Sequence, residues 1–194
     1  MKKITLIPAL LTLISPLAMA HPGHLHLGSH GFESGIMHPI TGLDHLSVMI
    51  AVGILASLFG GSARWSMPLA FVGVMIIGGL AGMGGLVLPG MEVAIAISVI
   101  AMGSMLISGA NMSKKLATGL IMAFAAFHGL AHGAEMPLDS QALSYFSGFV
   151  ISTAALHLTG IAIGEAGLYL TSNRVFARIA GGIMALLGGS LLIS

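Results

Sequence analysis

Two short histidine motifs, far apart in the sequence, carry the residue types that can do chemistry in this chain. HPITGLDH covers residues 38–45, and FHGLAHGAE covers residues 127–135. Imidazole nitrogen combined with carboxylate oxygen is a ligand set that suits divalent nickel, cobalt, zinc, copper or iron. The motifs therefore supply six candidate metal ligands: His38, Asp44, His45, His128, His132 and Glu135.

The spacing within each motif is helical. His38 and His45 stand seven residues apart, which places them nearly on one face of a single helix. Pro39 fits the first position of that helix, because no amide donor is lost there. Asp44 lies beside this face and either binds the ion directly or accepts a hydrogen bond from a ring, which fixes the tautomer of that histidine. In the second motif, the two histidines and the glutamate stand at positions i, i+4 and i+7 of one helical stripe.

The composition is that of an integral membrane protein. Of 194 residues, 7 are Lys or Arg and 6 are Asp or Glu, so charged residues make up 7%, against about 25% in soluble domains. Hydrophobic residues make up 56%, which is more apolar surface than a soluble globule can bury. This excludes a soluble enzyme, a disordered linker and a nucleic-acid binder, which would need a basic surface. Because the chain has no cysteine, a disulfide framework and a thiolate metal site are also excluded.

The first twenty residues are expected to be a cleaved signal peptide, 1–20. Lys2 and Lys3 precede an apolar stretch, and Ala18 to Ala20 form an A-x-A cleavage pattern; an uncleaved first transmembrane helix is the alternative. Residues 21–37 then form a His-rich extracytoplasmic leader, which we interpret as a metal-collecting tract rather than an ordinary polar lead-in. The histidines of this tract are His21, His24, His26 and His30.

The remaining residues, 38–194, predict an all-α membrane domain, a bundle of six transmembrane helices. Six apolar runs, each long enough to cross about 30 Å of hydrocarbon, are separated by short stretches that contain glycine, proline or charged residues. The runs are continuous rather than alternating, which disfavours a transmembrane β-barrel. The predicted helices lie near 38–59, 67–88, 91–110, 115–136, 140–163 and 174–194.

Charge determines the orientation that we expect for this bundle. With both mature termini outside, the first, third and fifth connections face the cytoplasm, where the positive-inside rule places basic residues. These connections hold all five basic residues of the mature chain: Arg64, Lys114, Lys115, Arg174 and Arg178. We therefore expect a multi-pass protein of the bacterial cytoplasmic (inner) membrane, with its mature N-terminus outside.

Both motifs then lie toward the outer face of the bundle, at matching depths. His38 and Glu135 are near the surface. His45 and His128, each seven residues further along its helix, lie about 10 Å deeper. If the two helices are neighbours, His38 and Glu135 form an outer rung, while Asp44, His45 and His128 form an inner rung. His132, the remaining histidine of the second motif, lies between the two rungs.

Other ionisable residues and many glycines also fall within the predicted spans. An ionisable group inside a membrane is costly and is a functional candidate for that reason. His157 and Glu165 are candidates for a metal path toward the cytoplasm, although a lone membrane histidine is more often structural, and Glu92 is a candidate for a supporting or interfacial role. The glycines, including the pairs at 78–79 and 181–182, predict close helix packing rather than ligand binding.

The two motifs, the His-bearing leader and the six spans together resemble the HupE/UreJ family of membrane proteins. HPITGLDH matches the family pattern H-P-x-x-G-x-D-H, and FHGLAHGAE is similar to the second histidine motif of the family. The resemblance covers the whole chain. It implies a nickel or cobalt permease associated with hydrogenase or urease maturation, in which the six candidate ligands contact the ion. The larger nickel/cobalt transporter family has H-x4-D-H, whereas five residues separate His38 from Asp44 here, so the mechanism of that family is not carried over.

These observations predict a metal permease rather than an enzyme, with Ni²⁺ or Co²⁺ as the transported ion and no catalytic cofactor. The expected partners are the ion, the lipid bilayer and metalloenzyme maturation proteins, and no nucleic acid. The sequence has no G-x-x-x-x-G-K-[ST] phosphate loop, so we expect uptake to be driven by the membrane potential, by ion gradients or by a separate partner. Two alternatives remain open: an intramembrane hydrolase that uses the same residues to hold zinc and activate water, and a sensor or accessory subunit that binds metal without transporting it.

Overall fold

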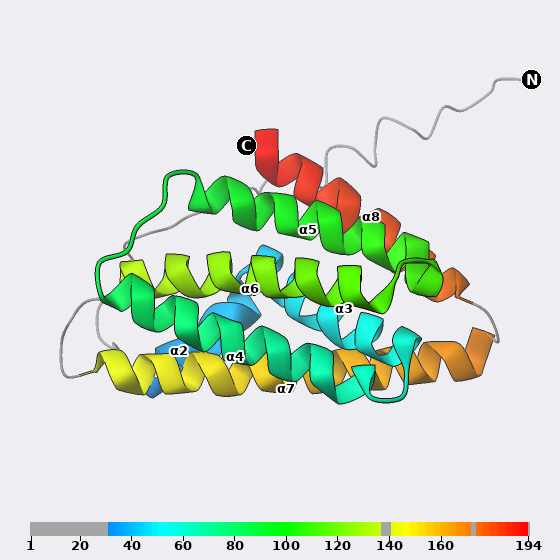
Figure 1. The fold of residues 1–194 in the computed structure, drawn as a ribbon, viewed down its shortest axis with the longest axis horizontal. Coiled ribbons are helices and arrows are strands. Elements are labelled where there is room, and N and C mark those ends of the chain that lie inside the picture. Colours follow the sequence, from blue (N-terminus) through cyan, green and yellow to red (C-terminus); the bar gives the residue numbers. More distant parts are fainter. Residues whose placement is uncertain (1–30, 137–140, 172–173, 194) are drawn as a thin grey trace, which may run out of the picture.

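Helices form all of the regular structure in the part of the chain that the computed structural model describes, residues 31–136, 141–171 and 174–193. The predicted signal peptide and the four leader histidines lie outside these residues. In chain order, the helices are α2 (Phe32–Thr41), α3 (Leu43–Phe59), α4 (Ala63–Met83), α5 (Met91–Ser108), the 3-10 helix η1 (Gly109–Asn111), α6 (Lys114–Glu135), α7 (Ala142–Thr171) and α8 (Val175–Ile193) (Figure 1).

The prediction of an all-α bundle of membrane-spanning length is confirmed for the described residues. The helices α4, α5, α6, α7 and α8 are each long and apolar enough to cross a membrane. A sixth span is reached only if α2 and α3 count together as one bent segment. The first predicted span therefore differs in kind from the other five.

The prediction of one uninterrupted helix over residues 38–59 is wrong, because the chain breaks at Gly42. The helices on either side of this residue, α2 and α3, are bent by 81° relative to each other. Gly42 itself is extended, with φ −81° and ψ 114°. Pro39 lies inside α2 rather than at a helix start. A proline without an amide donor and a glycine of low helix propensity, three residues apart, account for the interruption.

Other boundaries differ from the sequence prediction by smaller amounts. The segment preceding Gly42 is already helical from Phe32, so the end of the stretch predicted as leader belongs to α2. The helix α4 ends at Met83, before the predicted 88, and Gly85 follows with a φ of 92° that favours glycine. The helix α7 continues to Thr171, past the predicted 163.

The helices pack in groups that bring the two histidine motifs together. The helices α2 and α3 pack on α7, α4 packs along α6, and α5 packs on α8. In Figure 1, α5 and α8 lie on one side of the bundle and α7 on the opposite side. Because α3 and α6 pack mainly along different partners, the two motifs meet through side chains at the boundary between the α3–α7 group and the α4–α6 pair.

Glycine permits close approach of the helices in each group. A Cβ atom added to Gly53 of α3 would collide with the carbonyl oxygen of His157 of α7. A Cβ atom added to Gly181 of α8 would likewise collide with the carbonyl oxygen of Gly103 of α5, whereas Gly182 faces open space. The predicted packing role is therefore confirmed for Gly181 and is wrong for its neighbour.

Charged residues gather at two opposite ends of the bundle. At the basic end, where α4, α6 and α8 begin, the Arg64 Nε atom lies 2.8 Å from Oε1 of Glu165. The Lys114 Nζ atom donates a hydrogen bond of 2.7 Å to Oγ of Ser62 at the same end. The acidic end is where α6 ends and α5 begins, with Glu92 in the first turn of α5, where a carboxylate is favoured by the helix dipole.

The adjacent glycines of α8 give a matched test of this packing. Alanine raises intrinsic helix stability by about 1 kcal/mol relative to glycine at either position, but overpacking at Gly181 costs about 1–3 kcal/mol. We expect Gly181→Ala to lower the free energy of unfolding and Gly182→Ala to leave it unchanged or raised. Circular dichroism during unfolding of the detergent-solubilised protein measures the difference, and equal effects of the two substitutions would contradict the packing described.

Candidate metal centre

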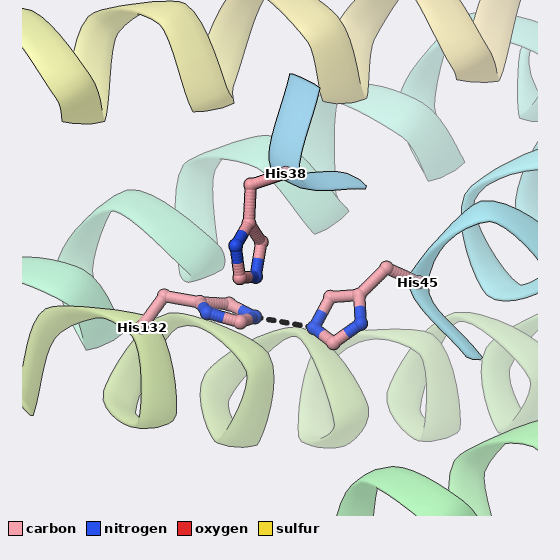
Figure 2. A group of neighbouring side chains, drawn as sticks. All are labelled: His38, His45 and His132. Atoms are coloured by element: carbon pink, nitrogen blue, oxygen red, sulfur yellow. Dashed lines mark hydrogen bonds between the residues drawn. The ribbon is translucent and has the colours of Figure 1, made fainter. Parts of the chain in front are cut away.

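Three histidine rings from three different helices converge near the acidic end of the bundle. They are His38 of α2, His45 of α3 and His132 of α6, and their ligand nitrogens all lie within 4.8 Å of one another. Figure 2 shows the three side chains pointing toward a common centre. His38 is half-buried, whereas His45 and His132 are only 6% and 4% exposed. Three imidazoles in this arrangement form a ligand set for a divalent transition-metal ion.

The Asp44 carboxylate fixes the tautomer and position of the His45 ring. Its Oδ1 atom accepts hydrogen bonds from the backbone N–H of His45 at 2.8 Å and from the ring Nδ1 at 2.6 Å. With Nδ1 acting as the donor, the Nε2 lone pair is free to face the centre, where Nε2 is in close contact with Nε2 of His132. This hydrogen bond has the geometry of the orienting role, which is one of the two roles that the sequence leaves open to Asp44.

A second carboxylate stands in the equivalent place on the other side of the centre. The Oε2 atom of Glu135 lies 3.7 Å from Nδ1 of His132, three residues earlier on α6. Both buried rings therefore present Nε2 to the centre and have a carboxylate near Nδ1. The two negative charges compensate a divalent cation that the rings would hold, which reduces the cost of burying it.

The backbone at this site also favours a cation. His38 lies in the last turn of α2 and His132 in the last turn of α6. The C-terminal end of a helix carries a partial negative charge, because its last carbonyl groups have no amide partner within the helix. The last turns of two helices therefore contribute rings to the centre, and the break at Gly42 ends one of these helices.

His128 lies next to the three-histidine cluster but deeper in the bundle. Its ring centroid is 5.2 Å from that of His45, and its side chain is fully buried. The carbonyl oxygen of Phe124 accepts a hydrogen bond of 2.9 Å from Nδ1 of His128. This assigns the proton to Nδ1 and leaves the Nε2 lone pair available as a donor atom for a metal.

The arrangement in two separate rungs is not what the structure shows. His38 approaches His132, with ring centroids 4.5 Å apart, and also His45, at 5.4 Å. The predicted partner of His38, Glu135, instead stands beside His132. The 81° bend moves the His38 ring toward the inner residues, so the predicted rungs merge into one cluster.

The remaining predicted residues lie elsewhere in the bundle. His157 is buried at the middle of α7. Glu165 is exposed at the basic end, where it pairs with Arg64. Glu92 is exposed in the first turn of α5 and is not one of the residues of the three-histidine cluster.

Sequence reasoning missed two kinds of residue that shape the site. Phe149 of α7 packs against the cluster, with ring centroids 4.8 Å from His132 and 6.0 Å from His38. Gly42 makes room for the Asp44–His45 pair and turns the chain between the two histidines. The combination of Pro39 and Gly42 within a helical pattern was the available signal for the break, whereas an aromatic residue in an apolar run carries no such signal.

The chain is similar to a known family of proteins over most of its length. The family model described as HupE / UreJ protein matches residues 9–191 of the chain. A protein named HupE from Rhizobium leguminosarum bv. viciae is 40% identical over 184 residues, which cover 94% of this chain and 96% of that protein. No solved structure matches the chain.

Gly42 provides a test of the site that leaves every candidate ligand in place. Alanine can adopt the backbone conformation of Gly42, but its Cβ would lie 2.9 Å from Oδ1 of Asp44 and 3.1 Å from Nδ1 of His45. We expect Gly42→Ala to displace this pair and to weaken Co²⁺ binding about 10- to 100-fold, as for other outer partners of metal-binding histidines. Titration of the Co²⁺ absorption spectrum in detergent measures the affinity.

The control for this substitution is Gly73→Ala, because Gly73 lies in α4 and an added Cβ there has open space around it. Its Co²⁺ affinity should equal that of the wild type. An unchanged affinity in Gly42→Ala as well would mean that the Asp44–His45 pair tolerates displacement and does not control the site.

Proposed function

The chain belongs to the HupE/UreJ protein family, and from that premise we propose that it is a permease that imports a divalent transition-metal ion, nickel or cobalt, across the bacterial cytoplasmic membrane. The observation that carries the proposal is the convergence of His38, His45 and His132 between helices of membrane-spanning length. Imidazole nitrogen selects transition-metal ions over the alkali cations and Mg²⁺, which prefer oxygen ligands.

The burial gradient of the site suits entry of an ion from one side. Glu135 is exposed and His38 is half-buried, whereas His45, His132 and then His128 are buried. In the proposed mechanism, the exposed carboxylate and the half-buried ring receive the hydrated ion. The buried rings then replace water molecules of its hydration shell, while the carboxylates compensate its charge.

The charges at the two ends of the bundle give its proposed orientation in the membrane, and the membrane potential then gives the direction of transport. We assign the basic end to the cytoplasm under the positive-inside rule, which places the three-histidine cluster toward the outer face. A divalent cation that moves inward gains about 4.6 kcal/mol per 100 mV of membrane potential, twice the value for a single charge. The ion delivered inside would serve the maturation of a metalloenzyme, with hydrogenase and urease as the candidates that the family resemblance supplies.

Uptake of radioactive nickel and cobalt into proteoliposomes tests the proposal, and Asp44→Asn is the informative substitution. The amide keeps the shape of the side chain but removes the charge and the strong acceptor for His45 Nδ1. We expect uptake to fall at least tenfold, with insertion into the membrane unchanged. The matched control is Glu33→Gln, which removes an exposed carboxylate from the first turn of α2 and should leave uptake unchanged.

The uptake measurement, together with an assay of hydrolysis, separates the permease from the two alternative functions. Binding of metal without flux through the wild-type protein would identify a sensor or accessory subunit. Turnover of a lipid or peptide by the purified, zinc-loaded protein, again without flux, would identify an intramembrane hydrolase. Normal uptake by Asp44→Asn would remove Asp44 from the transport site.

The histidine-rich leader generates a separate expectation. We propose that His21, His24, His26 and His30 collect metal outside the membrane before it reaches the bundle. Deletion of residues 22–30 should therefore reduce uptake several-fold at low metal concentration and should have little effect at saturating metal. Uptake measured over a range of nickel concentrations makes this comparison, and an equal loss at all concentrations would contradict a collecting role.

A further inference from the structure

Three buried side chains beyond the three-histidine cluster have polar atoms that no described protein group satisfies by a hydrogen bond. These atoms are both ring nitrogens of His157, Oγ1 of Thr153 and Nε2 of His128. His157 is 1% exposed, and the other two residues are fully buried. Buried polar groups in native proteins nearly always have a partner, and an exception calls for a specific explanation. Four such atoms, one on α6 and three on α7, indicate donor atoms that await a ligand.

These side chains continue the row of rings that begins at the cluster. The His128 ring is 5.2 Å from His45 on one side and 5.9 Å from Phe71 of α4 on the other, between ring centroids. Phe71 in turn makes an edge contact with His157, at 5.1 Å. The row therefore leads from His45 through His128 and Phe71 to the middle of α7.

One face of α7 connects the same two places. Phe149 packs against His132 of the cluster, and Thr153 and His157 follow at intervals of four residues on the same face. The backbones of α7 and α3 are in close contact at this level, because Gly53 lies against the carbonyl oxygen of His157 and Gly160 lies against that of Ile50. The unsatisfied donors of α7 are thus held inside the bundle by close helix packing.

From this arrangement we propose that Thr153 and His157 of α7 form a second, inner station for the transported divalent ion, which the ion reaches past Nε2 of His128. This inference rests on the proposed permease function. Imidazole nitrogen and hydroxyl oxygen would bind a transition-metal ion that keeps part of its hydration shell. The inner station has no carboxylate among these residues, in contrast to the Asp44 and Glu135 pair at the cluster, so it holds the ion more weakly and passes it on toward the basic end.

The substitution His157→Phe tests the inner station because it keeps a ring of similar size and removes both nitrogens. Nickel uptake into proteoliposomes should show a maximal rate at least tenfold lower than that of the wild type, with an unchanged nickel concentration at half-maximal uptake, since capture occurs at the cluster. The thermal unfolding temperature should not fall, because the substitution removes polar atoms that have no partner.

The matched pair Thr153→Val and Thr159→Val tests the hydroxyl. Thr153 is buried, whereas Thr159 is exposed on the same helix and its Oγ1 donates to the Ala155 carbonyl oxygen. Valine keeps the shape of threonine in both places. We expect the maximal rate to fall about threefold in Thr153→Val and to stay at the wild-type value in Thr159→Val.

Three results would overturn the inner station. Normal uptake by His157→Phe, with a working wild type, would show that the ion does not use this residue and would leave the permease function intact. A parallel loss of uptake and of thermal stability would show that His157 is structural. Absence of flux through the wild type would contradict the proposed function and the inner station together.

Discussion

A divalent ion can enter an apolar bundle only if its charge is compensated at close range, and the pairing of carboxylates with histidine rings meets this constraint. Asp44 lies at Nδ1 of His45, and Glu135 lies near Nδ1 of His132. The penalty for burying an uncompensated ion is several kcal/mol even after relaxation, so neutral imidazoles alone would bind the buried ion weakly. Asp44 accepts a hydrogen bond from Nδ1 of His45, which leaves Nε2 of that ring to face the shared centre, where it lies close to Nε2 of His132.

The break at Gly42 contributes to the same compensation of the ion's charge. A straight helix would carry His38 and His45 along one face, about 10 Å apart at 1.5 Å per residue. The 81° bend instead lets the two residues reach one centre from different directions. It also ends α2 beside the site, where the C-terminal end of a helix carries partial negative charge. Broken membrane helices whose termini bind ions recur in transporters, and in the proposed permease Pro39 and Gly42 would supply such an interruption.

Much of the site could be predicted from sequence, because composition and motif content do not depend on three-dimensional detail. A charged fraction of 7% requires a membrane environment, and the histidines of the two motifs supplied all three members of the cluster. The prediction fails where a periodic pattern continues across a backbone break: a straight helix pairs His38 with Glu135, whereas the bent segment brings the His38 ring to His132. Phe71 and Thr153 could not be identified because an aromatic or hydroxyl side chain in an apolar run acquires meaning only from its neighbours in space.

The helix groups explain why the polar residues form a row rather than a single pocket. Glycines allow α3 and α7 to pack closely, with Gly53 against the carbonyl oxygen of His157. The helices α4 and α6 pack along each other in the same way. Polar rings are therefore placed at the boundary between these groups, where side chains rather than backbones meet. Along this boundary the charge compensation declines, from two carboxylates beside the cluster to neutral nitrogen and hydroxyl donors at the middle of α7. Conduction requires binding that is favourable enough for entry and weak enough for release. In the proposed permease, a strongly compensated site followed by a neutral one is therefore the order that would allow an ion to be captured and then to leave.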